Sequence, residues 1–317
     1  MIAPNLIQEK DLEKTSKFKS ILITGGSGQV GSDLNDVKKT HNFKYHFPSS
    51  NVLNITQTDS IRNFLDNNNT DLILNLAAYT NVDKSENDRK TSKNVNNIGA
   101  SLLSKIAKDY GIGIIHFSTD YVFGGPPHKL RRVNDKVSPV NYYGLTKSKG
   151  EEAVLRNNKL GFIVRLASVY SIYGDNFVKK IMKLIIDENE VKVVSDQKIS
   201  VISSLDLAKN IPYLIELYKK NINIPDNNIL HLTNKGYTTW FKMAKVIKDE
   251  MRNILGNKIN TKIIPIKSTE WNSIAKRPLD SRLKVDFRKL ERENIKLLQW
   301  DESLRSIVKA ILSKGLN

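Results

Sequence analysis

Three residues of this sequence, Thr119, Tyr143 and Lys147, have the types and spacing needed for proton transfer. Tyr143 and Lys147 are four positions apart in a segment that we predict to be helical, so their side chains share one face. A phenol has an ordinary pKa of about 10 and is a poor acid or base near neutral pH. A lysine ammonium beside it favours the phenolate and brings the pKa into a useful range. The hydroxyl of Thr119, in the segment STDY, would hold a carbonyl oxygen, so the set is suited to alcohol and ketone chemistry.

A glycine-rich segment near the N-terminus predicts a binding site for a dinucleotide that supplies the hydride. Residues 25–31 read GGSGQVG, which satisfies GxxGxxG and, from Gly26, GxGxxG. The segment follows a predicted strand at 20–24 and precedes a helix that runs toward Lys39, the context that this motif requires. Glycines allow a tight turn and let backbone N–H groups approach a pyrophosphate at a helix N-terminus. The predicted contacts here are Gly25, Gly28, Gln29, Val30 and Gly31.

The end of the second predicted strand, at 44–47, favours NADPH over NADH by a modest margin. No carboxylate is present there to hold a ribose 2′-hydroxyl or to repel a 2′-phosphate, and no arginine is present either. Ser49 and Ser50 are suited to donate to a phosphate, and equally to serve as turn residues. NADH therefore stays an alternative. The other predicted cofactor contacts are Asn54, Ala77, Ala78, Tyr79 and Asn96, together with Tyr143 and Lys147.

Alternating strands and helices predict an α/β fold, a Rossmann-type doubly wound parallel sheet with a smaller C-terminal substrate-binding lobe. Further strands are expected at 71–76, 112–117 and 162–165, with helices at 58–67, 92–110 and 141–157. In the less regular second half we expect helices at 177–187, 204–219, 240–255 and 301–313 and a strand at 191–194. The predicted division is a flexible extension at 1–18, a dinucleotide-binding domain at 19–166 with 203–222 packing back onto it, and a substrate lobe at 167–202 and 223–317.

The composition limits the classes of protein that fit. At 317 residues the chain suffices for one large or two modest domains. It contains no cysteine, which excludes disulfides and thiolate catalysis, and we expect no metal because hydride and proton suffice. The charged N-terminus predicts no signal peptide, and no apolar run approaches the roughly 20 residues that span a bilayer. A cytoplasmic location is the simplest expectation.

The net charge of +17 admits attraction to nucleic acid or to anionic substrates. The lysines are dispersed, and no basic block with interleaved aromatic residues is present, which favours solvated helix faces. We therefore predict neither nucleic acid nor a membrane as a partner. The nucleic-acid alternative rests on charge alone, and salt-sensitive binding to duplex DNA would support it.

Seven segments of the chain resemble the extended short-chain dehydrogenase/reductase superfamily and, within it, the dTDP-4-dehydrorhamnose reductase family. The resemblance covers nearly everything after residue 19. The segments STDYVF and RPxxSxL are specific to this family rather than to the superfamily. The resemblance is carried by residues 25–31, 77–86 (AAYTNVDKSE), 118–123 (STDYVF), 139–147 (PVNYYGLTK), 174–177 (GDNF), 196–197 (DQ) and 277–283 (RPLDSRL).

The resemblance implies NADPH-dependent reduction of the C4 ketone of a nucleotide-linked 4-keto-6-deoxyhexose, for deoxysugar and polysaccharide biosynthesis. Tyr143 would protonate the C4 oxygen, Lys147 would hold the nicotinamide ribose and lower the pKa of Tyr143, and Thr119 would hydrogen-bond the reacting oxygen. Related dehydratases have a glutamate at the position of Tyr121, so reduction is the better interpretation. The implied substrate contacts are Asp120, Tyr121, Ser168, Asn176, Phe177, Gln197 and Arg277. For Arg277, pairing with the diphosphate and a structural salt bridge are both open.

Three departures from the family pattern fall in segments that we assign to the substrate side. Ser168 stands where the family has a tryptophan, residues 199–202 read ISVI instead of GSPT, and Phe123-Gly124-Gly125 replaces Phe-Asp-Gly. The cofactor and catalytic segments are intact. We therefore hypothesise retained hydride chemistry with altered or relaxed sugar specificity.

Two other functions remain open from the sequence. One is an NADP-binding regulatory subunit, because the β subunit of methionine adenosyltransferase resembles this same family. The intact Thr119, Tyr143 and Lys147 argue against that interpretation. The other is a nucleotide-sugar epimerase or reductase with a different sugar. The sequence is silent on oligomeric state, and a homodimer is kept as a hypothesis.

Overall fold

A six-stranded parallel sheet forms the centre of the structure, a computed structural model that describes residues 18–221 and 228–315. The strand order is β10-β5-β4-β3-β1-β2, which confirms the predicted Rossmann-type fold. Apolar runs predict β1, β3, β4 and β5, and β2 was also predicted, whereas the four-residue β10 was not. The strands are β1 (Ser20–Thr24), β2 (Lys44–His46), β3 (Leu72–Asn75), β4 (Gly113–Thr119), β5 (Gly161–Leu166) and β10 (Ile229–Leu232).

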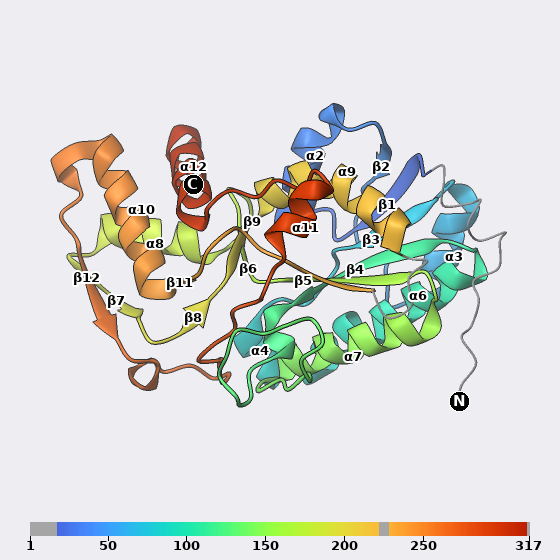
Figure 1. Ribbon diagram of the computed structural model, residues 1–317, viewed down its shortest axis with the longest axis horizontal. Helices are drawn as coiled ribbons and strands as arrows, with labels where there is room; N and C mark the ends of the chain where they lie inside the picture. The colour runs from blue at the N-terminus through green and yellow to red at the C-terminus, as the bar shows by residue number, and fades with distance from the viewer. Residues whose placement is uncertain (1–17, 222–227, 316–317) are drawn as a thin grey trace.

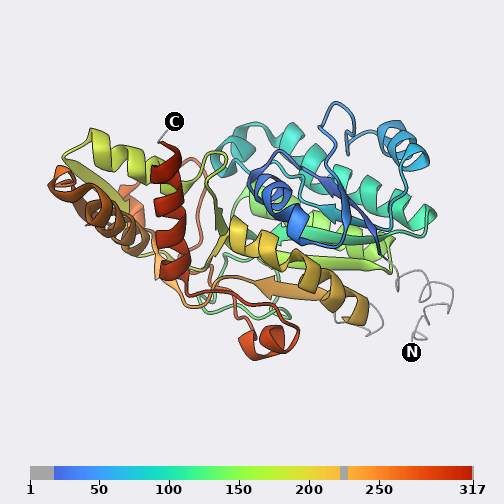
Figure 2. The same cartoon turned by 90° about the horizontal axis from the view of Figure 1, so that it is seen from above.

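Helices cover both faces of this sheet because successive strand residues point to opposite sides. In β1, Ile21 and Ile23 belong to one buried apolar cluster, while Leu22 belongs to the cluster on the other face. The first face is covered by α2 (Gln29–Val37) and α9 (Ser204–Asn221). The opposite face is covered by α3 (Thr58–Asn67), α6 (Ala100–Asp109) and α7 (Tyr142–Asn157). In Figure 1, α2 and α9 lie above the sheet and α6 and α7 below it, and Figure 2 looks from above onto the α2 and α9 side.

The helix expected at 92–110 is divided into three parts. It consists of α5 (Arg89–Lys93), the π-helical turn η2 (Asn94–Gly99) and α6. A π-helical turn is wider than an α-helical one and is frequent near functional sites. Hydrophobic periodicity did not reveal this break. The short elements around it are η1 (Lys38–Thr40), α4 (Val82–Asn87) and η3 (Asp120–Val122).

A smaller lobe with its own apolar cluster lies at the other end of the molecule (Figure 1). Its helices α8 (Phe177–Asp187), α10 (Trp240–Leu255) and α12 (Trp300–Lys314) pack beside the parallel pair of β7 (Glu190–Val194) and β12 (Lys262–Ile266). The predicted helices at 177–187 and 240–255 have these same bounds. The remaining elements are β6 (Ser168–Tyr170), β8 (Lys198–Ile199), β9 (Val201–Ser203), β11 (Thr238–Thr239), η4 (Gly256–Lys258), η5 (Ser268–Glu270) and α11 (Phe287–Arg292).

The structure differs from the predicted division at two places. Phe18, placed in the flexible extension, is buried and stacks on Tyr218 of α9 with 5.9 Å between ring centroids. The rest of that extension lies outside the described residues. Strand β10, placed in the substrate lobe, pairs with β5 in the main sheet, where its backbone gains hydrogen-bond partners. Helix α9 does pack onto the sheet, against α2.

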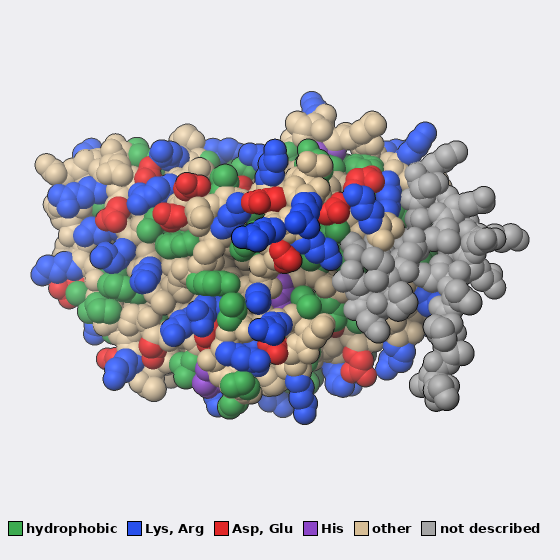
Figure 3. All heavy atoms as spheres, viewed as in Figure 1, with side chains coloured by type: hydrophobic (Ala, Val, Ile, Leu, Met, Phe, Trp, Pro, Cys, Tyr) green, Lys and Arg blue, Asp and Glu red, His purple; other side chains and the backbone are tan. Residues whose placement is uncertain are grey.

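On the face shown in Figure 3, lysine and arginine side chains are spread out and interspersed with acidic side chains. Within the described residues, no helix has the length and apolar character to cross a membrane. The same residues contain no group of three or more acidic, histidine or cysteine side chains placed to hold a metal ion.

Candidate active site

A pocket of about 960 Å³ opens at the carboxyl edge of the sheet, where ligands bind in α/β proteins of this kind. Both the sheet and the smaller lobe contribute to its walls. The predicted site residues that line it are Gly25, Gly28, Gln29, Val30, Gly31, Ser50, Asn54, Ala77, Ala78, Thr119, Asp120, Tyr121, Tyr143, Lys147, Ser168, Asn176, Phe177 and Arg277. The predicted residues that do not line it are Ser49, Tyr79, Asn96 and Gln197.

The glycine loop between β1 and α2 fits closely against the segment that follows β3. Gly25 has a φ of +69°, and a Cβ there would lie 2.7 Å from the backbone nitrogen of Ala77. A Cβ at Gly31 would meet the backbone of Gly26, so the first turn of α2 approaches the loop closely. Helix α2 begins at Gln29 with its amino end at the pocket, where backbone N–H groups favour an anionic ligand. The loop therefore fits a pyrophosphate group.

Thr119 and Tyr143 lie together at the end of β4 and the start of α7. The Thr119 hydroxyl donates to Oδ1 of Asp120 at 3.1 Å and accepts from the Tyr121 N–H at 3.2 Å. The ring of Tyr121 meets that of Tyr143 edge to face, 6.0 Å between centroids. Burial raises the pKa of Tyr143 to about 12, although its hydrogen bond with Thr119 offsets part of that rise. Tyr143 is therefore in its protonated form over the physiological pH range, as a proton donor must be.

Lys147 lies one turn further along α7 and is almost entirely buried. Its Nζ donates to the carbonyl oxygen of Phe117 at 2.7 Å and lies 3.4 Å from Nε2 of His116. Burial lowers the pKa of Lys147 to about 8, while Glu151 acts in the opposite direction. The expected lowering of the Tyr143 pKa by Lys147 is absent, because Nζ is turned to the end of β4 and burial dominates.

Asn141 fixes the start of the helix that carries Tyr143 and Lys147. Its side chain accepts from the N–H of Gly144 at 2.8 Å and donates to the carbonyl oxygen of Lys276 at 2.9 Å. A Cβ at Gly144 would collide with the carbonyl oxygen of Tyr121, so only glycine allows this approach of α7. Asn141 was not predicted as a site residue, although an asparagine before a helix is an ordinary capping signal.

Asn96, predicted to contact the cofactor, instead joins two parts of the scaffold. Its amide oxygen accepts from the N–H of Tyr79 at 2.9 Å, and its amide nitrogen donates to the Tyr79 carbonyl oxygen at 3.1 Å. The same nitrogen donates to the hydroxyl of Thr146 on α7 at 3.1 Å. Asn96 therefore holds the loop after β3 against the helix that carries Tyr143.

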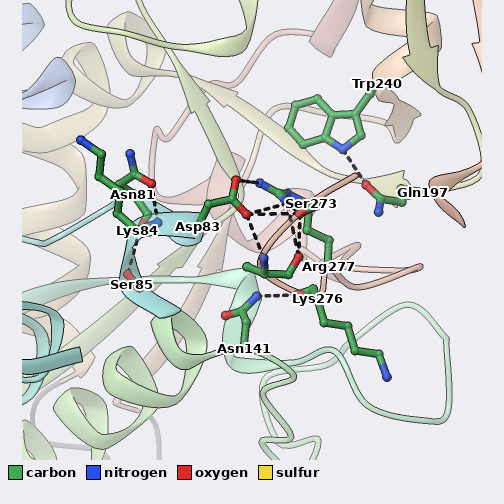
Figure 4. A network of polar contacts seen from close by, with 11 residues as sticks. Asn81, Asp83, Lys84, Ser85, Asn141, Gln197, Trp240, Ser273, Lys276 and Arg277 are labelled. Atoms are coloured by element: carbon green, nitrogen blue, oxygen red, sulfur yellow. Dashed lines mark hydrogen bonds and ion pairs between the residues drawn. The ribbon is translucent and has the colours of Figure 1, made fainter. Parts of the chain in front are cut away.

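An ion pair crosses one side of the pocket (Figure 4). Nη2 of Arg277 lies 2.7 Å from Oδ2 of Asp83 in α4, and the N–H of Ala275 donates to Oδ1 of Asp83 at 2.9 Å. Burial alone would raise the pKa of Asp83, but these hydrogen bonds hold it below its usual value. Arg277 also lines the pocket. The structure thus contains the structural salt bridge while leaving Arg277 beside the space for a ligand.

Another part of the pocket wall is an aromatic pair, of which only one residue was predicted from the sequence. Phe177, which was predicted, packs against Trp240 with 4.7 Å between ring centroids, and both residues line the pocket. The indole N–H of Trp240 donates to Oε1 of Gln197 at 3.1 Å, so Gln197 acts through Trp240 (Figure 4). Asn176 caps α8 by accepting from the N–H of Val178 at 3.1 Å. Trp240 begins the predicted helix at 240–255, but its position at the pocket depends on tertiary packing.

Only one of the three departures from the family pattern lies at the pocket. Ser168 lines it, whereas residues 199–202 and 124–125 do not. Ile199 and Ile202 belong to two buried apolar clusters, and the Ser200 hydroxyl accepts from the N–H of Leu283 at 3.1 Å. The expectation that all three changes cluster on the substrate side is therefore wrong for those two segments, because Ile199 and Ile202 pack inside the protein and Gly124 and Gly125 are buried away from the pocket.

A parallel sheet, a glycine loop after its first strand and a threonine, tyrosine and lysine at its carboxyl edge define a Rossmann-type, nicotinamide-dependent oxidoreductase. The chain belongs to the RmlD substrate binding domain family, whose sequence model matches residues 19–313. A dTDP-4-dehydrorhamnose reductase from Sinorhizobium fredii is 37% identical over 246 residues, covering 77% of this chain and 82% of the relative. The Bacillus subtilis spore coat polysaccharide biosynthesis protein SpsK is 30% identical over 285 residues, covering 90% and 95%.

Solved structures show the same similarity. A dTDP-4-dehydrorhamnose reductase from Clostridium acetobutylicum superimposes with a TM-score of 0.82 at 32% identity, covering 92% of this chain and 99% of that one. The Bacillus anthracis dTDP-4-dehydrorhamnose reductase, solved in complex with NADP, gives 0.81 at 27% identity, covering 93% and 100%. The family predicted from the sequence is confirmed.

Proposed function

We propose that this protein reduces the C4 ketone of a nucleotide-linked 4-keto-6-deoxyhexose with NADPH. The observation that carries the proposal is one pocket holding the glycine loop, the Thr119 hydroxyl, a protonated Tyr143 and a buried Lys147. The family membership supports the substrate class, because relatives over most of the chain are dTDP-4-dehydrorhamnose reductases.

The chain's residues divide the work of reduction among them. The bound nicotinamide supplies the hydride, and the glycine loop and the α2 amino end would hold its pyrophosphate. Tyr143 gives its phenolic proton to the ketone oxygen, and the Thr119 hydroxyl orients that oxygen. Lys147 would hold the ribose of the bound cofactor through its ammonium group. Tyr121 supplies no carboxylate for dehydration, which supports simple reduction.

The residues on either side of β2 support NADPH rather than NADH. Phe47 packs against Gly26, and the ammonium of Lys38 lies 5.5 Å from the centre of the Phe47 ring. Ser50 lines the pocket, and no acidic residue is present in the described segment 44–56. A lysine and a hydroxyl suit a 2′-phosphate, whereas a free 2′-hydroxyl would call for a carboxylate.

The test is NADPH oxidation with a panel of 4-keto sugar nucleotides, the rhamnose precursor being supplied with its epimerase. Tyr143→Phe removes the proton donor and is expected to lower kcat by about 10²- to 10⁴-fold with NADPH affinity retained. Tyr142→Phe, at the neighbouring residue that stacks on Arg89, is the matched control and should keep activity. Wild-type protein that binds NADPH tightly yet reduces no sugar of the panel would contradict the proposal and favour the regulatory-subunit function.

The same panel tests sugar specificity. Ser168 lines the pocket at a position where the family carries a bulky tryptophan, so we infer a wider sugar site that accepts several 4-keto sugars. A strong preference for the rhamnose precursor would show that the change leaves specificity intact.

A further inference from the structure

Behind Lys147, a buried chain of polar groups runs across the sheet. Nζ of Lys147 lies 3.4 Å from Nε2 of His116 on β4, and Nδ1 of that ring lies 2.9 Å from Nδ2 of Asn75 on β3. Oδ1 of Asn75 accepts from the hydroxyl of Thr24 on β1 at 2.7 Å. All four side chains are buried, and the reaction steps described above do not use His116, Asn75 or Thr24.

The order of donors and acceptors fixes the tautomer of His116. Complete burial and the nearby Lys147 lower its pKa well below the ordinary value, so the imidazole is neutral. The Thr24 hydroxyl donates to Oδ1 of Asn75, which turns the amide nitrogen toward His116, and an amide nitrogen can only donate. Nδ1 must therefore accept, which leaves the single ring proton on Nε2.

This tautomer presents an N–H group to Lys147. A neutral amine accepts such a hydrogen bond with its lone pair, whereas an ammonium group has no lone pair to offer. The other titratable groups near Lys147 are Glu151 and Tyr143, both on α7. Glu151 favours the ammonium form but is itself paired with Arg165 of β5 at 2.8 Å. The contact with His116 thus adds to burial in opposing the charge.

We propose that His116 and Asn75 are positioning residues that set the protonation state of Lys147, with Thr24 holding the Asn75 amide in place. The tautomer of His116 and its effect on Lys147 do not depend on the proposed function; only the consequence for NADPH binding rests on it. Because the ammonium form would hold the nucleotide ribose, NADPH affinity should fall as the pH rises and Lys147 loses its proton.

The first experiment needs neither cofactor nor substrate. In the ¹⁵N-histidine spectrum of the full chain, His116, identified through His116→Gln, should show a protonated Nε2 and a bare Nδ1. Asn75→Asp places an acceptor before Nδ1, and the proton should move there. Thr24→Val frees the Asn75 amide to turn over, so the tautomer protonated at Nδ1 should also become populated, without any added charge. Thr24→Ser keeps the hydroxyl and should keep the wild-type spectrum. A wild-type His116 protonated at Nδ1 overturns the proposal, as does an unchanged tautomer in Asn75→Asp and Thr24→Val.

The second experiment follows NADPH affinity against pH by nucleotide fluorescence. In Asn75→Asp, Nε2 of His116 becomes an acceptor that favours the ammonium form of Lys147. The pH at which NADPH affinity falls to half should therefore move upward by about one unit. Asn63→Asp adds the same charge on the exposed side of α3 and should leave the midpoint in place. Equal shifts in both variants, or none in Asn75→Asp, would contradict the role of the tautomer. Neither experiment depends on sugar turnover, so a failure of the proposed function is distinguishable from a failure of this inference.

Discussion

At the scale of single residues, burial is the main influence on the acid–base groups of this site. It keeps Tyr143 protonated and brings the pKa of Lys147 to about 8. It also raises the pKa of Asp120 to about 7, although Asp120 accepts a hydrogen bond from Thr119. Spacing within the sequence identified Tyr143 and Lys147, because they are neighbours on one helix, and the STDY segment at the end of a predicted strand identified Thr119. It could not identify His116 or Trp240, whose neighbours come from distant segments.

Asp120 gives a prediction about stability against pH. Its pKa in the folded state exceeds the ordinary value of 3.8, so the folded protein binds more protons between roughly pH 4 and pH 7. Wild-type stability should therefore fall as the pH rises through that window, with the full penalty present above it. Asp120→Asn has no carboxyl group to titrate at this position. Its unfolding free energy should therefore exceed that of wild type by an amount that grows with pH, to about a few kcal/mol by pH 7.5. Urea unfolding of the cofactor-free protein at several pH values measures this.

The control is Asp249→Asn on the exposed side of α10, which should show a small, nearly constant difference. A gap between Asp120→Asn and wild type that is the same at pH 4.5 and pH 7.5 would contradict the assigned cause.

At the scale of elements, close contacts with neighbouring segments, rather than an amphipathic face, hold α7 in the position where its side chains can act. The sequence predicted its bounds as 141–157, within one residue of the helix at Tyr142–Asn157. The π-helical turn at Asn94–Gly99 was missed, since it alters local hydrogen bonding without changing which residues are apolar. A Cβ at Gly150 of α7 would collide with the carbonyl oxygen of Asn96 in that turn, so glycine is what lets the helix approach the turn closely.

Gly144 tests this fit. In an ordinary exposed helix, glycine to alanine stabilises by about 1 kcal/mol. Here the new Cβ would press on the carbonyl oxygen of Tyr121, so Gly144→Ala should destabilise the protein by about 1–3 kcal/mol and lower kcat by displacing Tyr143. Thermal unfolding and NADPH oxidation measure the two effects. The control Lys149→Ala, about one turn further along on the exposed side of α7, should change neither thermal stability nor NADPH oxidation. A stabilised and fully active Gly144→Ala protein would contradict the prediction and show that α7 has room to shift.

At the scale of the whole molecule, the pocket lies between the sheet and the smaller lobe, and the pair of Asp83 and Arg277 connects their two walls. Both side chains are partly exposed, so the pair alone adds little to stability. Local patterns predicted the sheet well. They did not predict the exact division of the chain, because β10 joins the sheet only through pairing with a distant strand.

Arg277 separates the two roles that the sequence left open. If it also holds the substrate diphosphate, Arg277→Ala should raise KM for the sugar nucleotide by about 10- to 100-fold, as expected for a charged hydrogen bond. Asp83→Asn leaves the guanidinium free and should keep KM within a small factor. NADPH affinity should be unaffected in both. Equal losses of thermal stability in the two variants, with KM unchanged, would assign Arg277 to the salt bridge alone.

The path of the chain between the two parts has a consequence for synthesis on the ribosome. After β5 the chain enters the smaller lobe for α8 and β7, returns for α9 and β10, and leaves again for α10, β12 and α12. The edge of the sheet beside β5 therefore stays unpaired until residue 232 has left the exit tunnel. A nascent chain released at the end of β5 would expose that edge to other chains, so truncation there should give an aggregating fragment rather than an independent nucleotide-binding unit.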